Sequence, residues 1–480
     1  MKETFIIATL LLLTINFCSG QTNETKETKQ KIDAYIKDVI AINEIPGAAL
    51  AVIKDGKIIY EKYYGKASLE ENKPVDQNTI FKIFSTTKLM TNVGVFQLIE
   101  NGKLSLEDEI SKYLDNLPKE WQTIKVKYLL THSSGLPDII KFEDIPITLP
   151  YDKRIELLAK KPMEFSIGNQ YSYNQTNYLF LAKIIEKITG LTFDQYILQN
   201  QFSNVKSGVY LSSNFGEVFP NSAFRYSFNR QTNTYEKSVT DSGKDSHSSN
   251  GINISLPEFI RWNQNLDNNS YLKSETKHIM WEPFQFKNKY DFGHGWGIYP
   301  VNAIFTYGFS GGNETAIRKF TTNNLTVIFL SNGHKYSGVQ DQVVTHVAGI
   351  VDQTLFDEYA ITDEKITFDF VKLDFNKAEQ NYIAIKKQHP EWNFEERLNT
   401  IGYALMMCKR INDAIKVFEL NTKENPQSGN AYDSLAEGYF TDNQFEISKQ
   451  NYLKSLKFAP DNNNAKKMLK KIDTILAKKS

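Results

Sequence analysis

Ser85 and Lys88 are the residues whose types and spacing most directly suggest chemistry. They begin and end the tetrad Ser85-Thr86-Thr87-Lys88, which precedes an apolar run at helical spacing over residues 89–98. Residues three apart on a helix are neighbours, so the Lys88 amine can reach the Ser85 hydroxyl. A serine is a weak nucleophile until a base takes its proton, and a desolvated lysine can become that base. The tetrad therefore indicates nucleophilic catalysis, although the same spacing also occurs in solvated helix starts.

Four later segments carry further polar and glycine residues. They read LLTHSSGLP at 129–137, GNQYSYNQTNY at 168–178, GHGWG at 293–297 and GFSGGN at 308–313. In this order and spacing, the set resembles the motifs of the serine beta-lactamase and penicillin-binding-protein superfamily. The most similar branch contains class C beta-lactamases, D-Ala-D-Ala carboxypeptidases, D-aminopeptidases and family VIII esterases. The resemblance covers residues 28 to 357.

The resemblance implies an α/β fold of the α+β kind, in which N- and C-terminal strands share one antiparallel sheet flanked by helices. Strands are expected at 48–54 and 57–65, joined by the turn Asp55-Gly56, and at 304–309, 315–320 and 325–331. A closing helix is expected at 343–356. The implied pocket lies between the sheet and the helices.

The resemblance also implies roles for the first two motifs. Ser85 would be the acylated nucleophile, and Lys88 would help to deprotonate it. The second family motif is Tyr-x-Asn, which aligns here with Tyr173 and Gln175, so Tyr173 would share the proton with Lys88 and pass it to the leaving group. A slip of register would move this role to Tyr171 or Tyr178. Gln175 keeps an amide but is one methylene longer than asparagine, which changes its reach toward substrate.

The third motif departs further from the family pattern. Where the family has Lys-Thr-Gly or His-Ser/Thr-Gly, this chain has Phe309-Ser310-Gly311. A phenyl ring neither carries charge nor donates a hydrogen bond, so recognition of a substrate carboxylate is expected to be weaker. The backbone N–H groups of Gly312 and Ser85 would still form the oxyanion hole. Family VIII esterases also place an aromatic residue here, which favours ester substrates, with Ser310 and Phe309 on the pocket wall.

The other motifs receive structural interpretations. His132 is expected to belong to a loop stabilised by turn residues rather than to act in catalysis. The seven histidines and two cysteines show no paired spacing typical of a metal site, and no phosphate loop or dinucleotide fingerprint is present. The sequence therefore predicts no cofactor and no metal.

The charge balance and the N-terminal residues restrict the possible partners and the location of the protein. Lys+Arg and Asp+Glu both number 56, which argues against nucleic acid as the main partner. Residues 1–20 resemble a secretory signal peptide, with Lys2 before an apolar run that is too short to span a membrane. Cleavage after Gly20 is expected, and a lipid anchor at Cys18 is the alternative. Cleavage would leave Cys408 without a cysteine partner in the same chain. No transmembrane segment is expected.

The chain is expected to divide into several parts. Residues 21–30 are predicted to be a disordered lead, residues 31–357 the hydrolase domain, and residues 358–375 a linker without helical period. Beyond the linker, Gly402, Ala414, Phe418 and Pro426 recur 34 residues later as Ala436, Ser448, Tyr452 and Pro460. This period is typical of tetratricopeptide repeats, and residues 376–480 are predicted to form an all-α repeat domain. Helices at 377–388 and 464–478 would flank the repeats.

Two hypotheses of function follow. In the first, the protein is a secreted or periplasmic serine hydrolase that acts on an ester or amide of a small molecule or peptide. In the second, it is a catalytically weak binding or sensing protein, and the repeats bind a protein partner. The departures at Gln175 and Phe309 motivate the second hypothesis.

Overall fold

The computed structural model describes residues 26–205, 207–229, 231–336 and 338–477. They divide into two compact units: unit 1 runs to Phe228 and resumes over Tyr235–Phe356, and unit 2 takes Asn229–Thr234 and continues from Asp357. The predicted signal peptide and Cys18 lie outside the described residues. None of the helices in the described ranges has the length and apolarity that a membrane span requires.

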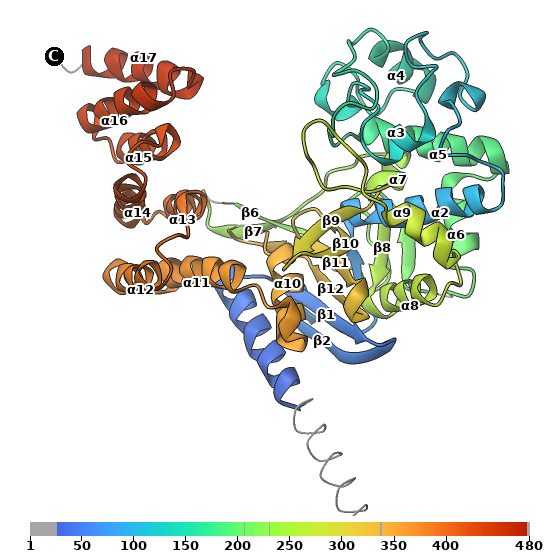
Figure 1. The fold of residues 1–480 in the computed structure, drawn as a ribbon, viewed down its shortest axis with the longest axis horizontal. Coiled ribbons are helices and arrows are strands. Elements are labelled where there is room, and N and C mark those ends of the chain that lie inside the picture. The colour runs from blue at the N-terminus through green and yellow to red at the C-terminus, as the bar shows by residue number, and fades with distance from the viewer. Residues whose placement is uncertain (1–25, 206, 230, 337, 478–480) are drawn as a thin grey trace, which may run out of the picture. The chain divides into compact units, whose positions relative to one another are not determined.

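Unit 1 is built on a seven-stranded antiparallel sheet with the order β3-β2-β1-β12-β11-β10-β9. Figure 1 shows β1 and β2 beside β12, so the predicted sharing of one sheet by N- and C-terminal strands is confirmed. The strands are β1 (Gly47–Lys54), β2 (Lys57–Ser68), β3 (Lys73–Pro74), β9 (Gly297–Val301), β10 (Ile304–Gly311), β11 (Thr315–Phe320) and β12 (Leu325–Ser331).

Local sequence explains the central hairpin. Strand β1 is an almost unbroken buried apolar run, as expected of a strand covered on both faces. Asp55 and Gly56 have φ values of 50° and 74°, which is the double positive φ of the tight turn predicted between β1 and β2.

Two small sheets and a set of helices complete unit 1. The sheets are β13-β6-β7 and β4-β8-β5, with β4 (Ile80–Lys82), β5 (Val209–Leu211), β6 (Tyr226–Asn229), β7 (Thr234–Lys237), β8 (Ile252–Ser255) and β13 (Gly333–His334). The longer helices are α2 (Lys88–Glu100), α4 (Tyr151–Leu158), α5 (Gln175–Thr189), α6 (Phe193–Gln201), α8 (Leu256–Asp267), α9 (Ser274–Trp281) and α10 (Gln340–Val351). Short helices are α3 (Val126–Leu130) and α7 (His247–Asn250). Helix α10 begins three residues before the predicted closing helix.

Helix α2 lies at the centre of the core. Its residues 88–96 are all buried, and its apolar side chains share one cluster with Ala49, Ala51 and Ile53 of β1 and with residues of α5 and α8. The first residue of α2 is Lys88, so the core fixes the position of this amine.

The predicted disordered lead is partly wrong. Residues 26–43 are helical, while 21–25 lie outside the described residues. Ile32, Ile36 and Val39 are buried along one side of this helix, and Asp33 lies 2.5 Å from the Lys62 amine of β2. The polar residues before Ile32 are the solvated start of an amphipathic helix, which composition alone does not distinguish from disorder.

The predicted linker is also wrong. Residues Glu358–Lys372 form helix α11, whose first turn is capped by the Asp357 side chain, which accepts a hydrogen bond from the Ala360 N–H at 2.9 Å. Ile366 and Phe370, one turn apart, are buried against the following helices. Only this narrow apolar stripe marks α11 in the sequence.

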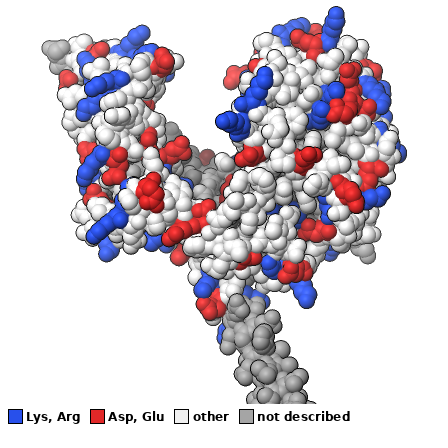
Figure 2. Space-filling model, viewed as in Figure 1, with Lys and Arg blue, Asp and Glu red and all other residues white. Residues whose placement is uncertain are grey.

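Unit 2 continues as helix pairs: α12 (Phe375–Gln388), α13 (Glu395–Met407), α14 (Ile411–Glu424), α15 (Gly429–Thr441), α16 (Phe445–Phe458) and α17 (Asn463–Ala477). Gly402 of α13 faces Phe418 of α14, and their counterparts 34 residues on, Ala436 and Tyr452, share a cluster between α15 and α16. The all-α domain is confirmed, and its assignment to tetratricopeptide repeats stays a prediction. On the face in Figure 2, positive and negative side chains are interspersed over both units.

Candidate active site

Ser85 lies in a strained turn between β4 and α2, the 3-10 turn η1 (Phe84–Thr87). The residue before it has a φ of 48°, which non-glycine residues rarely adopt. A Cβ built on Gly311 of β10 would lie 2.3 Å from the Ile83 carbonyl oxygen and 2.9 Å from the Ser85 nitrogen. Thr315 Oγ1 donates to the same carbonyl at 3.1 Å. Strands β10 and β11 therefore stabilise the turn, and such backbone strain is typical of functional sites.

The Lys88 amine is fully buried and faces three acceptors. Its Nζ lies 3.5 Å from Ser85 Oγ, 3.0 Å from Gln175 Oε1 and 2.9 Å from the Ser249 carbonyl oxygen. The distance to Ser85 is at the limit of a hydrogen bond, and such contacts in unliganded sites often shorten when substrate binds. The structure thus brings together the predicted nucleophile and base.

Burial of Lys88 lowers the pKa of its amine well below the ordinary value, and the charge of Asp138 opposes this shift only in part. The start of α2 adds in the same direction, because the positive end of a helix dipole disfavours a cation. A lysine in this setting is a competent base toward a serine hydroxyl.

Tyr173 lies beside this pair. Its ring centroid is 4.9 Å from Lys88 Nζ, and its buried hydroxyl has no hydrogen-bond partner among the described residues. Burial raises the pKa of the phenol to about 12, although Ser85 and Gln175 lie near enough to lower it in part. A neutral phenol without a partner is free to give a proton to a departing group.

Gln175 connects the site to a buried carboxylate that the sequence did not reveal. The Gln175 N–H donates to Asp138 Oδ1 at 3.1 Å, and burial raises the pKa of Asp138. Asn174 caps α5 by accepting from the Thr176 N–H, which fixes Gln175 as the first helical residue. Asp138 directly follows the turn Gly135-Leu136-Pro137, and this turn is the one feature of the sequence that could have indicated Asp138 as a site residue.

His132 is a packing neighbour of Tyr173 rather than a proton carrier. Its ring centroid lies 4.6 Å from that of Tyr173, and its Nδ1 accepts from the Asn174 N–H at 3.1 Å. Burial lowers the pKa of His132 well below its usual value, so the imidazole stays neutral. Its contact with Tyr173 positions the phenol, which goes beyond the loop role expected for His132.

The end of β10 carries the predicted oxyanion and wall residues. Gly312 has a φ of 61°, and a Cβ there would lie 2.6 Å from the Phe84 ring, so its backbone lies against the η1 turn that carries Ser85. Ser310 Oγ donates to Asp341 Oδ1 of α10 at 2.6 Å, and this commits its proton away from substrate. Phe309 is nearly buried, with its ring centroid 6.2 Å from that of Tyr173.

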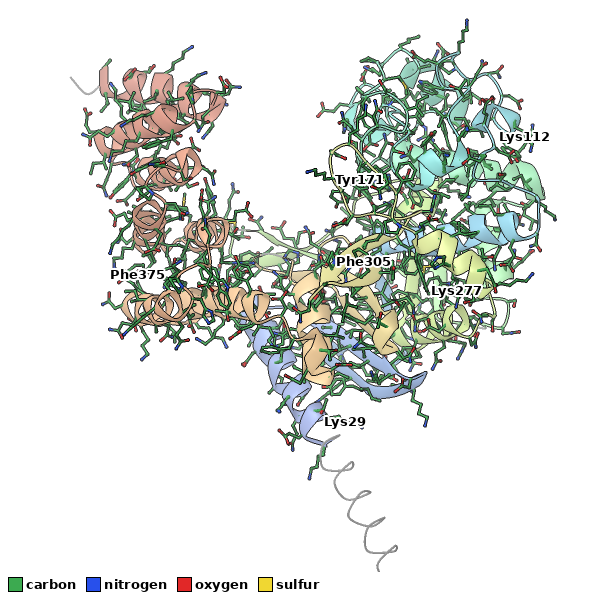
Figure 3. All side chains as sticks on the ribbon, viewed as in Figure 1. Lys29, Lys112, Tyr171, Lys277, Phe305 and Phe375 are labelled. Atoms are coloured by element: carbon green, nitrogen blue, oxygen red, sulfur yellow. The ribbon has the colours of Figure 1, made fainter. Side chains whose placement is uncertain are left out.

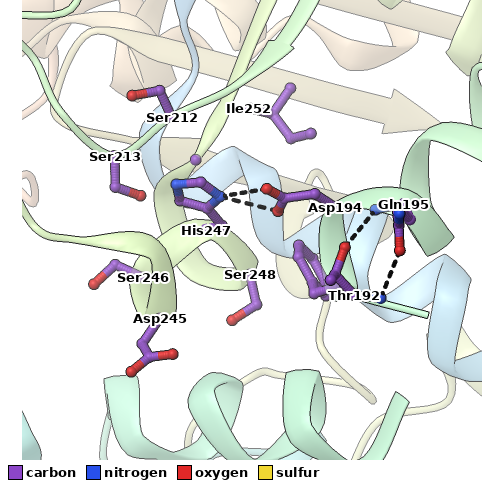
Figure 4. A network of polar contacts seen from close by, with 12 residues as sticks. Thr192, Asp194, Gln195, Ser212, Ser213, Asp245, Ser246, His247, Ser248 and Ile252 are labelled. Carbon is purple, nitrogen blue, oxygen red and sulfur yellow. Dashed lines mark hydrogen bonds and ion pairs between the residues drawn. The ribbon is translucent and has the colours of Figure 1, made fainter. Parts of the chain in front are cut away.

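Helix α7 supplies the Ser249 carbonyl and is anchored by a polar network (Figure 4). His247 Nδ1 lies 2.9 and 3.0 Å from the two carboxylate oxygens of Asp194 on α6. Thr192 and Gln195 form a capping box that fixes the first turn of α6. This contact between two helices positions the carbonyl that accepts from Lys88.

Two pockets meet at Ser85. The aliphatic pocket has a volume of 440 Å³, and its apolar wall consists of Ile139, Ile140, Phe142, Ile145, Pro146, Ile147 and Leu179. The aromatic pocket has a volume of 490 Å³ and is lined by Tyr171, Tyr173, Tyr290, Phe292, Tyr299 and Phe309; Tyr171 is labelled in Figure 3. Gln175 lines the aliphatic pocket and Tyr173 the aromatic one.

A third pocket of 920 Å³ lies apart from Ser85 and contains two buried lysines. Their amines already have partners: Lys277 donates to the Leu266 carbonyl at 2.7 Å, and Lys319 to Asn263 Oδ1 at 2.6 Å. Lys319 also donates to Thr326 Oγ1 at 3.3 Å, but this threonine lies within strand β12 and not in a strained turn before a helix like that of Ser85. Within the described ranges, no group of three or more His, Cys, Asp or Glu residues could hold a metal ion.

Comparison with known proteins gives consistent similarities. The family model described as beta-lactamase matches residues 32–349. Protein flp of Staphylococcus aureus (strain MW2) is 25% identical over 322 residues, which cover 64% of this chain and 59% of that protein. Penicillin-binding protein 4* of Bacillus subtilis (strain 168) is 25% identical over 331 residues, covering 64% of this chain and 72% of that one. The match thus spans less than two thirds of the length of flp.

Solved structures share the fold. The octameric penicillin-binding protein homologue from Pyrococcus abyssi matches with a TM-score of 0.61 and 23% identity, over 70% of this chain and 81% of that one. The crystal structure of SurE matches with a TM-score of 0.59 and 18% identity, over 70% and 77% of the two chains. At these identities the similarity shows the fold alone.

Gly311→Ala tests whether the close packing of β10 maintains the conformation of the η1 turn that carries Ser85. The added methyl group would overlap two backbone atoms, so the reaction of Ser85 with a fluorophosphonate is expected to slow by roughly 100-fold, as for loss of an oxyanion donor. Labelling is measured by intact mass, with circular dichroism to confirm folding. Gly56→Asn is the control, because no atom lies within 4 Å of a Cβ there and asparagine tolerates positive φ. A folded Gly311→Ala protein labelled at the original rate would contradict this account.

Proposed function

The chain belongs to the beta-lactamase family, and we propose that it is an exported serine hydrolase that cleaves an ester or amide through an acyl-enzyme. The observation that carries the proposal is the buried Lys88 amine, with its lowered pKa, 3.5 Å from Ser85 Oγ. Export rests on the signal-like residues 1–20.

In the proposed first half-reaction, Ser85 Oγ bonds to the carbonyl carbon while its proton passes to Lys88 Nζ. The backbone N–H groups of Ser85 and Gly312 stabilise the oxyanion. The bond from the carbonyl carbon to the leaving group then breaks. The leaving oxygen or nitrogen takes a proton from Tyr173 Oη, which recovers one from the Lys88 ammonium. In the second half-reaction, a water oxygen bonds to the acyl carbon while its proton passes to Lys88 Nζ. The bond from that carbon to Ser85 Oγ then breaks, the acid leaves, and Ser85 Oγ takes a proton back from the Lys88 ammonium.

Esters are the favoured substrates. The Phe309 ring takes the place of a basic family residue and offers no charge to a substrate carboxylate. In Ser310, the hydroxyl proton is donated to Asp341. Both features favour a substrate without a carboxylate beside the scissile bond. We further propose that the helices of unit 2 bind a protein partner.

Hydrolysis of p-nitrophenyl acetate by the chain and by Ser85→Ala tests the proposal. Turnover is expected to fall by roughly 10³-fold or more in Ser85→Ala, because the nucleophile is lost. A fluorophosphonate should add its mass to the wild-type protein and not to the variant. Equal turnover in both proteins, or no adduct on the wild type, would favour the binding or sensing hypothesis instead.

Tyr173→Phe separates proton transfer from structure. The lost hydroxyl has no hydrogen-bond partner among the described residues, so stability is expected to be unchanged or slightly higher. The kcat toward an alkyl acetate, whose alcohol must be protonated as it leaves, should fall by about 10²- to 10⁴-fold. Tyr178→Phe is the matched control, because it removes the bond from Tyr178 Oη to Asn92 Oδ1 at 2.9 Å. It should lower the free energy of unfolding by about 1 kcal/mol and keep its turnover. The reverse pattern would remove Tyr173 from the mechanism.

A further inference from the structure

The two pockets at Ser85 indicate how an ester substrate is oriented in the site. Ser85 lines both pockets, Tyr173 lines the aromatic pocket, and Gln175 lines the aliphatic pocket. In the proposed reaction the leaving group takes its proton from Tyr173 Oη and must lie on the Tyr173 side. The alcohol part of an ester therefore occupies the aromatic pocket, and the acyl part extends into the aliphatic pocket.

Most of the apolar wall of the aliphatic pocket comes from one short segment, residues 139–147, and Leu179 of α5 completes it. Ile140 is 69% exposed and Ile147 is 42% exposed, although both line the pocket. Large aliphatic side chains with this much exposure beside a reactive serine gain burial when an apolar group lies between them. Their position favours a substrate whose acyl chain is aliphatic.

The charges around the same pocket oppose an anionic acyl group. Arg154 lines the pocket but is paired with Asp245, which also lies 3.5 Å from the Lys183 amine. Asp241 and Glu143 are further lining residues and are both acidic. A carboxylate on the acyl chain would meet these acids and find the guanidinium already engaged.

We propose that the substrates are esters of uncharged aliphatic carboxylic acids several carbons long, with the acyl chain bound against Ile140 and Ile147. This inference rests on the proposed function, because it needs Ser85 to form the acyl-enzyme. It assigns Ile140 and Ile147 to acyl-chain specificity.

The test compares p-nitrophenyl esters from acetate to octanoate on the full chain. In the wild type, kcat/KM is expected to rise by about fourfold for each added methylene until the pocket is filled. In the double variant Ile140→Gln/Ile147→Gln the rise per methylene should fall to half or less. Ile58→Gln is the matched control, since Ile58 is 46% exposed on β2 and lines neither pocket. Fluorophosphonate labelling of Ser85 verifies that each variant keeps an intact site.

A second series keeps the acetyl group and varies the alcohol from methyl to butyl to phenyl. The double variant should leave the dependence of kcat/KM on the alcohol unchanged, because the alcohol lies in the other pocket. If the double variant loses the dependence of kcat/KM on the alcohol and keeps the dependence on acyl length, the two pockets have the opposite roles. That result would overturn the inference. Turnover that depends on Ser85 but not on acyl length would overturn this inference alone. Absence of Ser85-dependent turnover with every ester would remove the proposed function, and this inference with it.

Discussion

Burial of the Lys88 amine is the constraint on which the site depends. The amine lies at the first residue of the central core helix α2, where the Ser249 carbonyl and Gln175 accept its protons and the rings of Tyr173 and Tyr178 each lie 4.9 Å away. Desolvation in this enclosure lowers the pKa of the amine well below its ordinary value and so favours the uncharged form, which can accept a proton. Neighbouring elements maintain this geometry: β10 packs against the η1 turn that carries Ser85, and the contact between α6 and α7 positions the Ser249 carbonyl.

The same burial has a thermodynamic consequence. In the unfolded chain Lys88 binds a proton up to its ordinary pKa of 10.5, whereas in the folded chain it releases that proton at a lower pH. Between these two values the unfolded state carries more protons, so this residue destabilises the fold, and the effect fades as pH rises toward 10.5. A residue that costs stability at neutral pH is understandable where its uncharged amine has a chemical role.

The sequence predicted those parts of the fold and the site that depend on local spacing. The hairpin at Asp55-Gly56 follows from turn chemistry, and the proximity of Ser85 and Lys88 follows from their spacing of three residues. The shared sheet was implied by the family resemblance and not by local spacing. Asp138 and Ser249 were missed, because they reach the site through contacts between segments far apart in the chain. The helices at 26–43 and Glu358–Lys372 were missed because their apolar stripes are narrow and their other residues are polar. In both, packing against a neighbour stabilises a helix that composition alone does not reveal.

The most direct measurement of the central claim is the rate of Ser85 phosphonylation by a small fluorophosphonate as a function of pH. This reaction needs the base but no proton for a leaving alcohol, so it reports on Lys88 in isolation from Tyr173. The account predicts that the rate rises as pH increases through the pKa of Lys88 and levels off well below the ordinary 10.5, because the folded amine is already deprotonated there. A rate that continues to rise until pH 10.5 or above would show an ordinary lysine and contradict the account.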